Sequence, residues 1–160
     1  MIRDLNNIPA LIHNVDSILQ ATAEVVGEYL EGKILDMINS QGNGQWPPLA
    51  KSTKRKKGSS QAWVDTGELR AQIVHRILHD GLGKSIQVGI FESEYGFIAA
   101  CLEFGTNDTG AVTAGGMKNQ WKKQHIPERP LFRLTFDLEA ENVEQLIARE
   151  LDRQIDKYLL

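Results

Sequence analysis

A long amphipathic pattern near the N-terminus constrains the fold of this chain more than any other feature. From about Ile8 to Asn39, apolar residues recur every three or four positions, which predicts one face of an α-helix. Such a helix spans about 45 Å, whereas a compact chain of this length has a radius of gyration of about 15 Å. The helix therefore either extends beyond its own domain or breaks into two packed pieces at Gly27 and Gly32. We favour one helix, bent or frayed near Gly32.

Two β-branched runs in the middle of the chain predict a β-hairpin. They cover Ile73 to Leu78 and Ser85 to Ile90, and a glycine-containing turn separates them. A helix from Glu94 to Phe104 is expected next. Its apolar residues share one side: Phe97, Ile98, Cys101 and Leu102. We expect Gly105 to end this helix, because glycine adopts the left-handed conformation without strain.

Three further helical segments complete the pattern. The run from Lys51 to Lys57 predicts one or two helical turns. The phrase from Asp65 to Leu69 predicts a helix start, because Asp65 or Thr66 can accept hydrogen bonds from the free N–H groups of the first turn. From Glu139 onward, apolar residues fit a surface helix with a charged outer face.

These elements predict an α+β fold, in which a small antiparallel sheet packs with a long N-terminal helix and a C-terminal helix. The chain has 160 residues, of which 41% are hydrophobic, so we expect a single domain over residues 1–160. Residues 106–124 lack a core-forming period and predict a long flexible arm. No apolar stretch approaches the roughly 20 residues of a membrane span, and the N-terminus does not read as a signal peptide, so we expect a protein made in the cytoplasm.

Four short phrases each combine a turn or helix boundary with an aromatic or charged residue. They are Trp46-Pro47-Pro48-Leu49, Asp65-Thr66-Gly67-Glu68-Leu69, Glu103-Phe104-Gly105-Thr106 and Ile126-Pro127-Glu128-Arg129-Pro130. None holds a nucleophile beside a base, a metal-ligand cluster or a phosphate cradle. The phrases therefore indicate an architectural role.

The order and spacing of these phrases resemble the tail-completion and head-to-tail joining proteins of long-tailed bacteriophages, also called virion morphogenesis proteins. That family typically shows a Trp-Pro-Leu-like phrase, a threonine and a lysine, then Leu-x-Asp-Thr-Gly-x-Leu, Glu-Phe-Gly-Thr and Ile-Pro-Ala-Arg-Pro-Phe. The match covers roughly residues 20 to 135. The chain departs from the family at Glu128, where a small residue is usual, and at Leu131-Phe132, which replaces Phe-Leu.

The resemblance implies a structural virion protein that forms a ring, with six copies, at the head–tail junction or the tail terminus. Its partners would be further copies of itself and tail tube, tail terminator or head connector proteins, with DNA only passing through the ring. It implies no enzymatic activity, no cofactor, no metal and no membrane, and assembly in the cytoplasm of the host bacterium. The motif and interface candidates are Trp46, Pro48, Lys54, Lys56, Asp65, Thr66, Gly67, Leu69, Glu103, Phe104, Gly105, Thr106, Trp121, Arg129 and Pro130.

Charge is distributed unevenly behind a net charge of -3. Residues 1–40 hold two basic and six acidic residues, residues 41–80 hold seven and three, and residues 81–160 hold nine and twelve. A subunit with a basic middle and acidic ends can attract its neighbour head to tail.

Two rival functions come from other classes. A nucleic-acid-binding accessory protein would use the cations of Lys51 to Lys57 to release counterions from phosphates. That run has no interleaved aromatic residue for base stacking, so we favour a solvated loop or a subunit contact. A small hydrolase would need a convergent site, and Glu103 is a lone carboxylate. We expect it to form an ion pair or a helix-end bond, with Arg129 as a candidate partner.

Histidines and tryptophans give no stronger signal of a site. His75 and His79 have the i, i+4 spacing that binds a metal only on a helix, and a strand would hold them about 13 Å apart. We therefore predict no metal site. Trp46, Trp63 and Trp121 are expected to anchor loops to the core, although exposed tryptophans also serve at interfaces.

Overall fold

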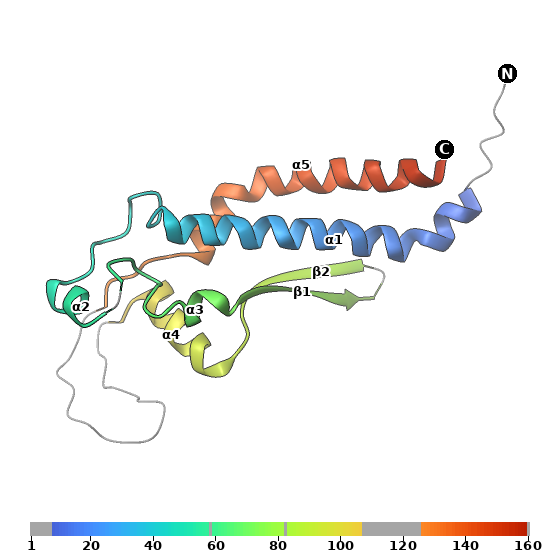
Figure 1. The fold of residues 1–160 in the computed structure, drawn as a ribbon. Coiled ribbons are helices and arrows are strands. Elements are labelled where there is room, and N and C mark those ends of the chain that lie inside the picture. The colour runs from blue at the N-terminus through green and yellow to red at the C-terminus, as the bar shows by residue number, and fades with distance from the viewer. Residues whose placement is uncertain (1–7, 58, 82, 107–125, 160) are drawn as a thin grey trace. The chain divides into compact units, whose positions relative to one another are not determined.

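The computed structural model describes residues 8–57, 59–81, 83–106 and 126–159 (Figure 1). In chain order the elements are α1 (Ile8–Asn39), α2 (Lys51–Lys56), α3 (Glu68–Ala71), β1 (Ile73–Asp80), β2 (Gly83–Ile90), α4 (Ser93–Phe104) and α5 (Phe132–Leu159). Strands β1 and β2 pair as an antiparallel two-stranded sheet. The predicted α+β fold class is confirmed.

The long N-terminal pattern folds as one helix. Gly27 and Gly32 both lie within α1, so the alternative of two packed pieces is wrong, and the helix runs seven residues past Gly32 to Asn39 without fraying there. The hairpin and the helices α2 and α4 are confirmed within a residue or two of their predicted bounds. Helix α5 begins at Phe132 and not at Glu139, and the cause lies in a contact described below.

The chain divides into two compact units. The hairpin unit comprises residues 1–31, 75–88 and 138–160, and the motif unit comprises residues 32–74 and 89–137. Helices α1 and α5 each contribute residues to both units. In the described part of the chain, no helix has the length and apolar character that a membrane crossing requires.

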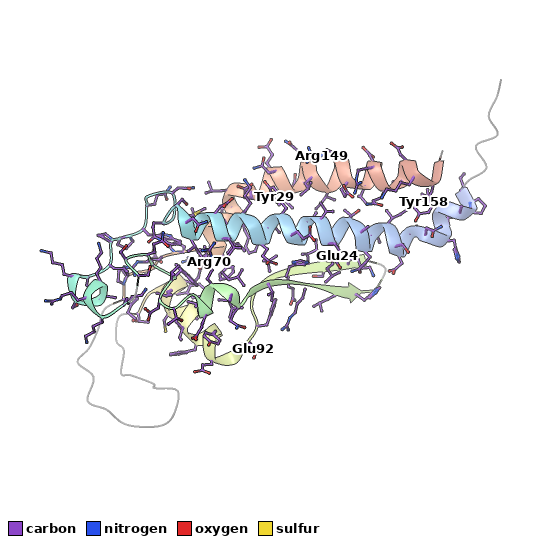
Figure 2. The ribbon with its side chains drawn as sticks, in the orientation of Figure 1. Glu24, Tyr29, Arg70, Glu92, Arg149 and Tyr158 are labelled. Atoms are coloured by element: carbon purple, nitrogen blue, oxygen red, sulfur yellow. The ribbon has the colours of Figure 1, made fainter. Side chains whose placement is uncertain are left out.

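In the hairpin unit, α1 lies between α5 on one side and the β-hairpin on the other (Figure 1). Tyr29 points toward α5 and its hydroxyl donates to the Glu139 carboxylate at 2.6 Å (Figure 2). Toward the hairpin, Asp16 holds the ammonium group of Lys84 at 2.8 Å. This bond to Lys84 lowers the pKa of the Asp16 carboxyl.

The closest contact between α1 and the hairpin places an imidazole on a glycine. A β-carbon at Gly27 would lie 2.4 Å from Cδ2 of His75, so the ring occupies space that only glycine leaves open. His75 Nδ1 lies 2.9 Å from Glu31, and Nε2 lies 3.2 Å from Glu24. Ionised carboxylates only accept hydrogen bonds, so both ring nitrogens must carry protons in this arrangement. The hydrogen bond to Glu31, followed by that to Glu24, raises the pKa of His75 although burial opposes it.

We predict a pH-dependent contribution of His75 to stability. Because its pKa is raised above the usual 6.5 in the folded state, the contribution is complete below about pH 6.5 and is lost as the pH rises through the folded pKa. Replacing Glu31 or Glu24 by Gln should lower the His75 pKa, measured by NMR titration of the ring, and flatten the fall in unfolding free energy between pH 6 and pH 8.5.

Glu28→Gln is the matched control, because this residue is exposed on the same helix. It should leave the His75 titration unchanged. A ring pKa that moves equally in all three variants would contradict the specific pairing.

Candidate functional site

The motif unit brings three of the four phrases into direct contact. The indole N–H of Trp46 donates to the carbonyl of Pro130 at 3.0 Å, and that of Trp63 donates to the carbonyl of Arg129 at 3.1 Å. The two ring centroids lie 6.4 Å apart, and both tryptophans are buried. The predicted role of Trp46 and Trp63 as anchors is confirmed, and their shared target is the fourth phrase.

Arg129 ties the fourth phrase back to the first. Its side chain is buried, and its guanidinium donates to the carbonyls of Pro47 at 3.0 Å, Pro127 at 3.2 Å and Pro48 at 3.4 Å. Burial lowers the pKa of this guanidinium. A planar group with five donors suits carbonyls that approach from different directions. Arg129 therefore stabilises two proline-rich turns through their backbone.

Glu103, in the third phrase, holds the beginning of α5. Its buried carboxylate accepts the backbone N–H groups of Leu131 at 2.6 Å, Phe132 at 3.1 Å and Arg133 at 3.1 Å. The first N–H groups of a helix have no partner within the helix, and a negative charge there also interacts favourably with the helix dipole. The predicted helix-end bond is confirmed, but Arg129 as its partner is wrong.

This contact explains the early start of α5. Periodicity alone places the helix from Glu139, but the acceptor for its first turn comes from Glu103, far away in the sequence. The guanidinium of Arg133 donates in return to the Glu103 backbone carbonyl at 3.0 Å and lies 5.0 Å from the centroid of the Phe104 ring. Sequence reasoning did not identify Arg133 and Phe132 as residues of this site. The available signal was the charge of Arg133, which lies close to the start of the helix.

Gly105 allows the third and fourth phrases to pair through their backbones. Thr106 N–H donates to the Ile126 carbonyl at 2.8 Å, and Ile126 N–H donates to the Thr106 carbonyl at 3.2 Å. A β-carbon at Gly105 would lie 2.8 Å from the nitrogen of Glu128. With φ 67° and ψ 176°, Gly105 has positive φ but not the predicted left-handed helical conformation. The chain leaves α4 extended because it must reach Ile126.

The second phrase begins α3 in a way that the sequence did not predict. Gly67, at φ 98°, occupies the N-cap position, so the N-cap residue itself has no side chain that could bond to the first turn. The Thr66 hydroxyl accepts the N–H of Glu68 at 3.4 Å, which closes a turn ahead of the helix. Thr66 thus accepts a free N–H group of the first helical turn, as predicted, but it does so from the position before the N-cap residue.

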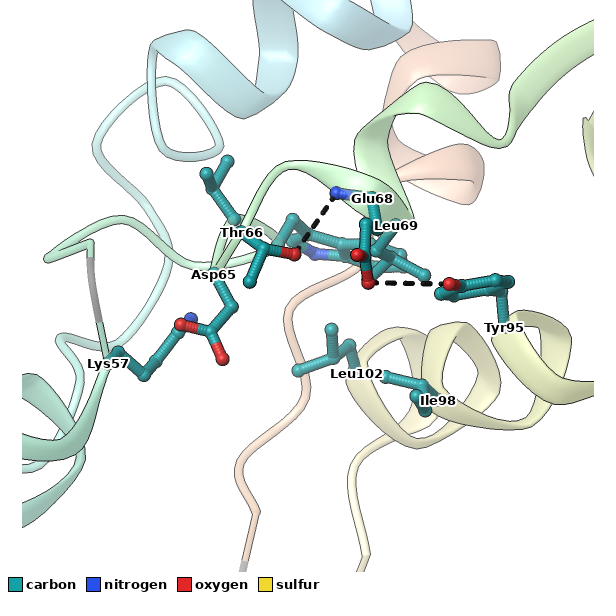
Figure 3. A pocket seen from close by; sticks show the side chains of 10 residues that line it. Lys57, Asp65, Thr66, Glu68, Leu69, Tyr95, Ile98 and Leu102 are labelled. Atoms are coloured by element: carbon teal, nitrogen blue, oxygen red, sulfur yellow. Dashed lines mark hydrogen bonds between the residues drawn. The ribbon is translucent and has the colours of Figure 1, made fainter. Parts of the chain in front are cut away.

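The second phrase lines an open pocket of about 360 Å³ (Figure 3). Leu69, Ile98 and Leu102 supply apolar surface, while Lys57 and Asp65 stand at its polar side. The Tyr95 hydroxyl donates to Glu68 at 3.4 Å, and the negative charge of Glu68 raises the pKa of this phenol. No nucleophile lies beside a base among these lining residues, so the pocket suits binding of an apolar side chain better than catalysis.

Several of the remaining predicted residues lie on the surface. Lys54, Lys56 and Pro48 are exposed, and Phe104 has 64% of its surface exposed. Trp121 and nearly all of the predicted arm fall outside the described residues. Among the residues that the structure describes, no three His, Cys, Asp or Glu side chains gather where they could hold a metal ion.

Comparisons with known proteins give no relative. No family model, curated protein or solved structure matches this chain. The resemblance to the phage proteins therefore rests on the four phrases alone.

We predict that the Glu103 carboxylate is a major stabilising group of the motif unit. Glu103→Ala leaves three N–H groups without their acceptor and should lower the unfolding free energy by about 3 kcal/mol, whereas Glu103→Gln keeps one acceptor oxygen and should lower it by about 1–2 kcal/mol. Glu128→Gln is the control, because Glu128 is exposed and its carboxylate makes only a long contact with Arg133, at 3.4 Å. Urea titration should show a change below about 0.5 kcal/mol for this control, and equal losses at both positions would contradict the prediction.

We predict that Arg129 cannot be replaced by another cation. Arg129→Lys retains the charge but cannot donate to three separated carbonyls in the same geometry, so the unfolding free energy should fall by about 2–3 kcal/mol, and Arg129→Met should cost about 3–4 kcal/mol. Arg55→Lys, on the exposed surface of α2, should change it by less than about 0.5 kcal/mol. Thermal or chemical unfolding checks the series, and an Arg129→Met variant as stable as the wild type would refute it.

Proposed function

We propose that this protein is a structural component of a bacteriophage virion, which forms a ring at the head–tail junction or the tail terminus and completes or joins the tail. The proposal takes its direction from the ordered set of four phrases. It is supported by the way in which these phrases use their side chains. A ring of six copies would contact tail tube, tail terminator or head connector proteins and would let DNA pass through its centre.

One observation carries the proposal: the two buried charged residues of the phrases bind backbone groups and do not face space that a substrate could enter. Glu103 and Arg129 are both buried. The carboxylate is occupied by N–H groups and the guanidinium by carbonyls. Groups held in this way fix the path of the chain and take no part in proton transfer. Such rigidity suits a subunit that must present a constant surface to its neighbours.

The test is deletion of the gene from the phage or prophage genome that carries it, followed by electron microscopy of the induced lysate. We expect unjoined heads and tails, or tails with an incomplete end, and restoration by the wild-type gene supplied in trans. Complementation with Glu103→Ala should fail if this variant is unstable. Normal infectious virions without the gene would overturn the proposal.

A second candidate function has one observation in its favour. The cations Lys51, Lys54, Arg55 and Lys56 are exposed on α2, and such a cluster can bind phosphates. Fluorescence anisotropy with labelled duplex DNA tests this reading. A nucleic-acid-binding protein should show affinity that falls steeply with salt and is lost in Lys54→Glu/Arg55→Glu/Lys56→Glu.

A further inference from the structure

The motif unit carries a basic face. It consists of Lys51, Lys54, Arg55 and Lys56 on α2, all exposed. None of these four cations forms an ion pair with an acid among the described residues. Two exposed prolines, Pro47 and Pro48, stand shortly before α2, and Arg129 fixes both through their carbonyls. The basic face therefore comes shortly after two exposed proline rings whose backbone is held in place.

The same unit carries an acidic and apolar face on α4. Glu94, Phe97 and Ile98 have the i, i+3, i+4 spacing that places them on one side of a helix. Phe97 and Ile98 are 55% and 45% exposed, although the sequence placed them on the apolar side of this helix. Glu92 projects outward at the start of α4 (Figure 2). Neither Glu92 nor Glu94 has an ion-pair partner among the described residues.

We propose that the basic face of one copy docks on the acidic and apolar face of a second copy. The two faces are opposite in charge, and each has exposed charges that the rest of the described chain leaves unpaired. Cations pack favourably against aromatic faces such as that of Phe97. The proposal rests on the assembly proposed above and names the surfaces that would form it.

The geometry of this contact sets the kind of assembly. The two faces belong to different elements of the same unit, so every copy offers both halves and the contact can repeat head to tail as a heterologous one. Repetition of a heterologous contact closes into a ring when its rotation allows. Binding of nucleic acid to α2 would leave the exposed apolar side of α4 unexplained. A second copy accounts for both faces.

Charge reversal on each face provides the experiment. The first variant is Lys54→Glu/Arg55→Glu/Lys56→Glu, and the second is Glu92→Lys/Glu94→Lys. Sedimentation velocity on the full chain should show that the wild type associates at about 50 mM salt and dissociates toward monomers at about 500 mM salt, because screening weakens contacts between exposed charges. Each variant alone should associate at least tenfold more weakly. An equimolar mixture should associate again, because the reversed α2 of one variant meets the reversed α4 of the other.

Glu141→Lys/Glu144→Lys is the matched control. It makes the same charge change at two exposed positions of α5 in the hairpin unit and should associate like the wild type. Circular dichroism should show all variants folded, because every altered side chain is exposed.

Three results would overturn the proposal: a wild type that stays monomeric at low salt up to about 100 µM, single variants that associate like the wild type, or a mixture that does not recover. Loss of DNA binding in the first variant with unchanged association would assign α2 to nucleic acid. Failure of the proposed function is distinguishable, since charge-dependent association would then persist for a protein whose gene deletion leaves virions normal.

Discussion

The motif unit depends on one contact, that of the Glu103 carboxylate with the first turn of α5. A helix start leaves N–H groups without partners, and a carboxylate is the strongest acceptor that a side chain can offer them. Here the acceptor comes from the end of α4, so the contact joins two helices that a long stretch of sequence separates. The extended path at Gly105 and the pairing of Thr106 with Ile126 both follow from the need to bring these helix ends together.

Arg129 performs the complementary task with the opposite charge. Prolines cannot donate a backbone hydrogen bond, so proline-rich turns leave carbonyls that must find donors elsewhere. The guanidinium donates to the carbonyls of Pro47, Pro48 and Pro127. The indole N–H groups of the two tryptophans donate to the carbonyls of Arg129 and Pro130. Glu103 thus accepts backbone N–H groups and Arg129 donates to backbone carbonyls in the motif unit, and the two side chains do not bind each other.

The sequence predicted the helices and strands better than it predicted their ends and the contacts between them. Local spacing was sufficient for α1, the hairpin and α4, because their apolar residues repeat over many positions. It failed for the start of α5, which depends on Glu103, and it missed Gly67 as the N-cap residue of α3. The partner of Glu103 was also misassigned, because a nearby opposite charge is visible in a sequence whereas a row of free N–H groups is not. The anchoring role of Trp46 and Trp63 was predictable, but the backbone atoms that they bind were not.

The use of backbone partners affects how the contacts within the motif unit can evolve. Carbonyl and N–H groups are present whatever side chain a position carries, so Pro130, Leu131 or Pro47 can supply its bond without a particular side-chain chemistry. A change at Arg129, Trp46 or Trp63, by contrast, cannot be compensated by a second substitution at the residue that supplies the carbonyl, because no side chain there makes the hydrogen bond. We therefore expect these three hydrogen bonds to leave no covariation between the positions that they join.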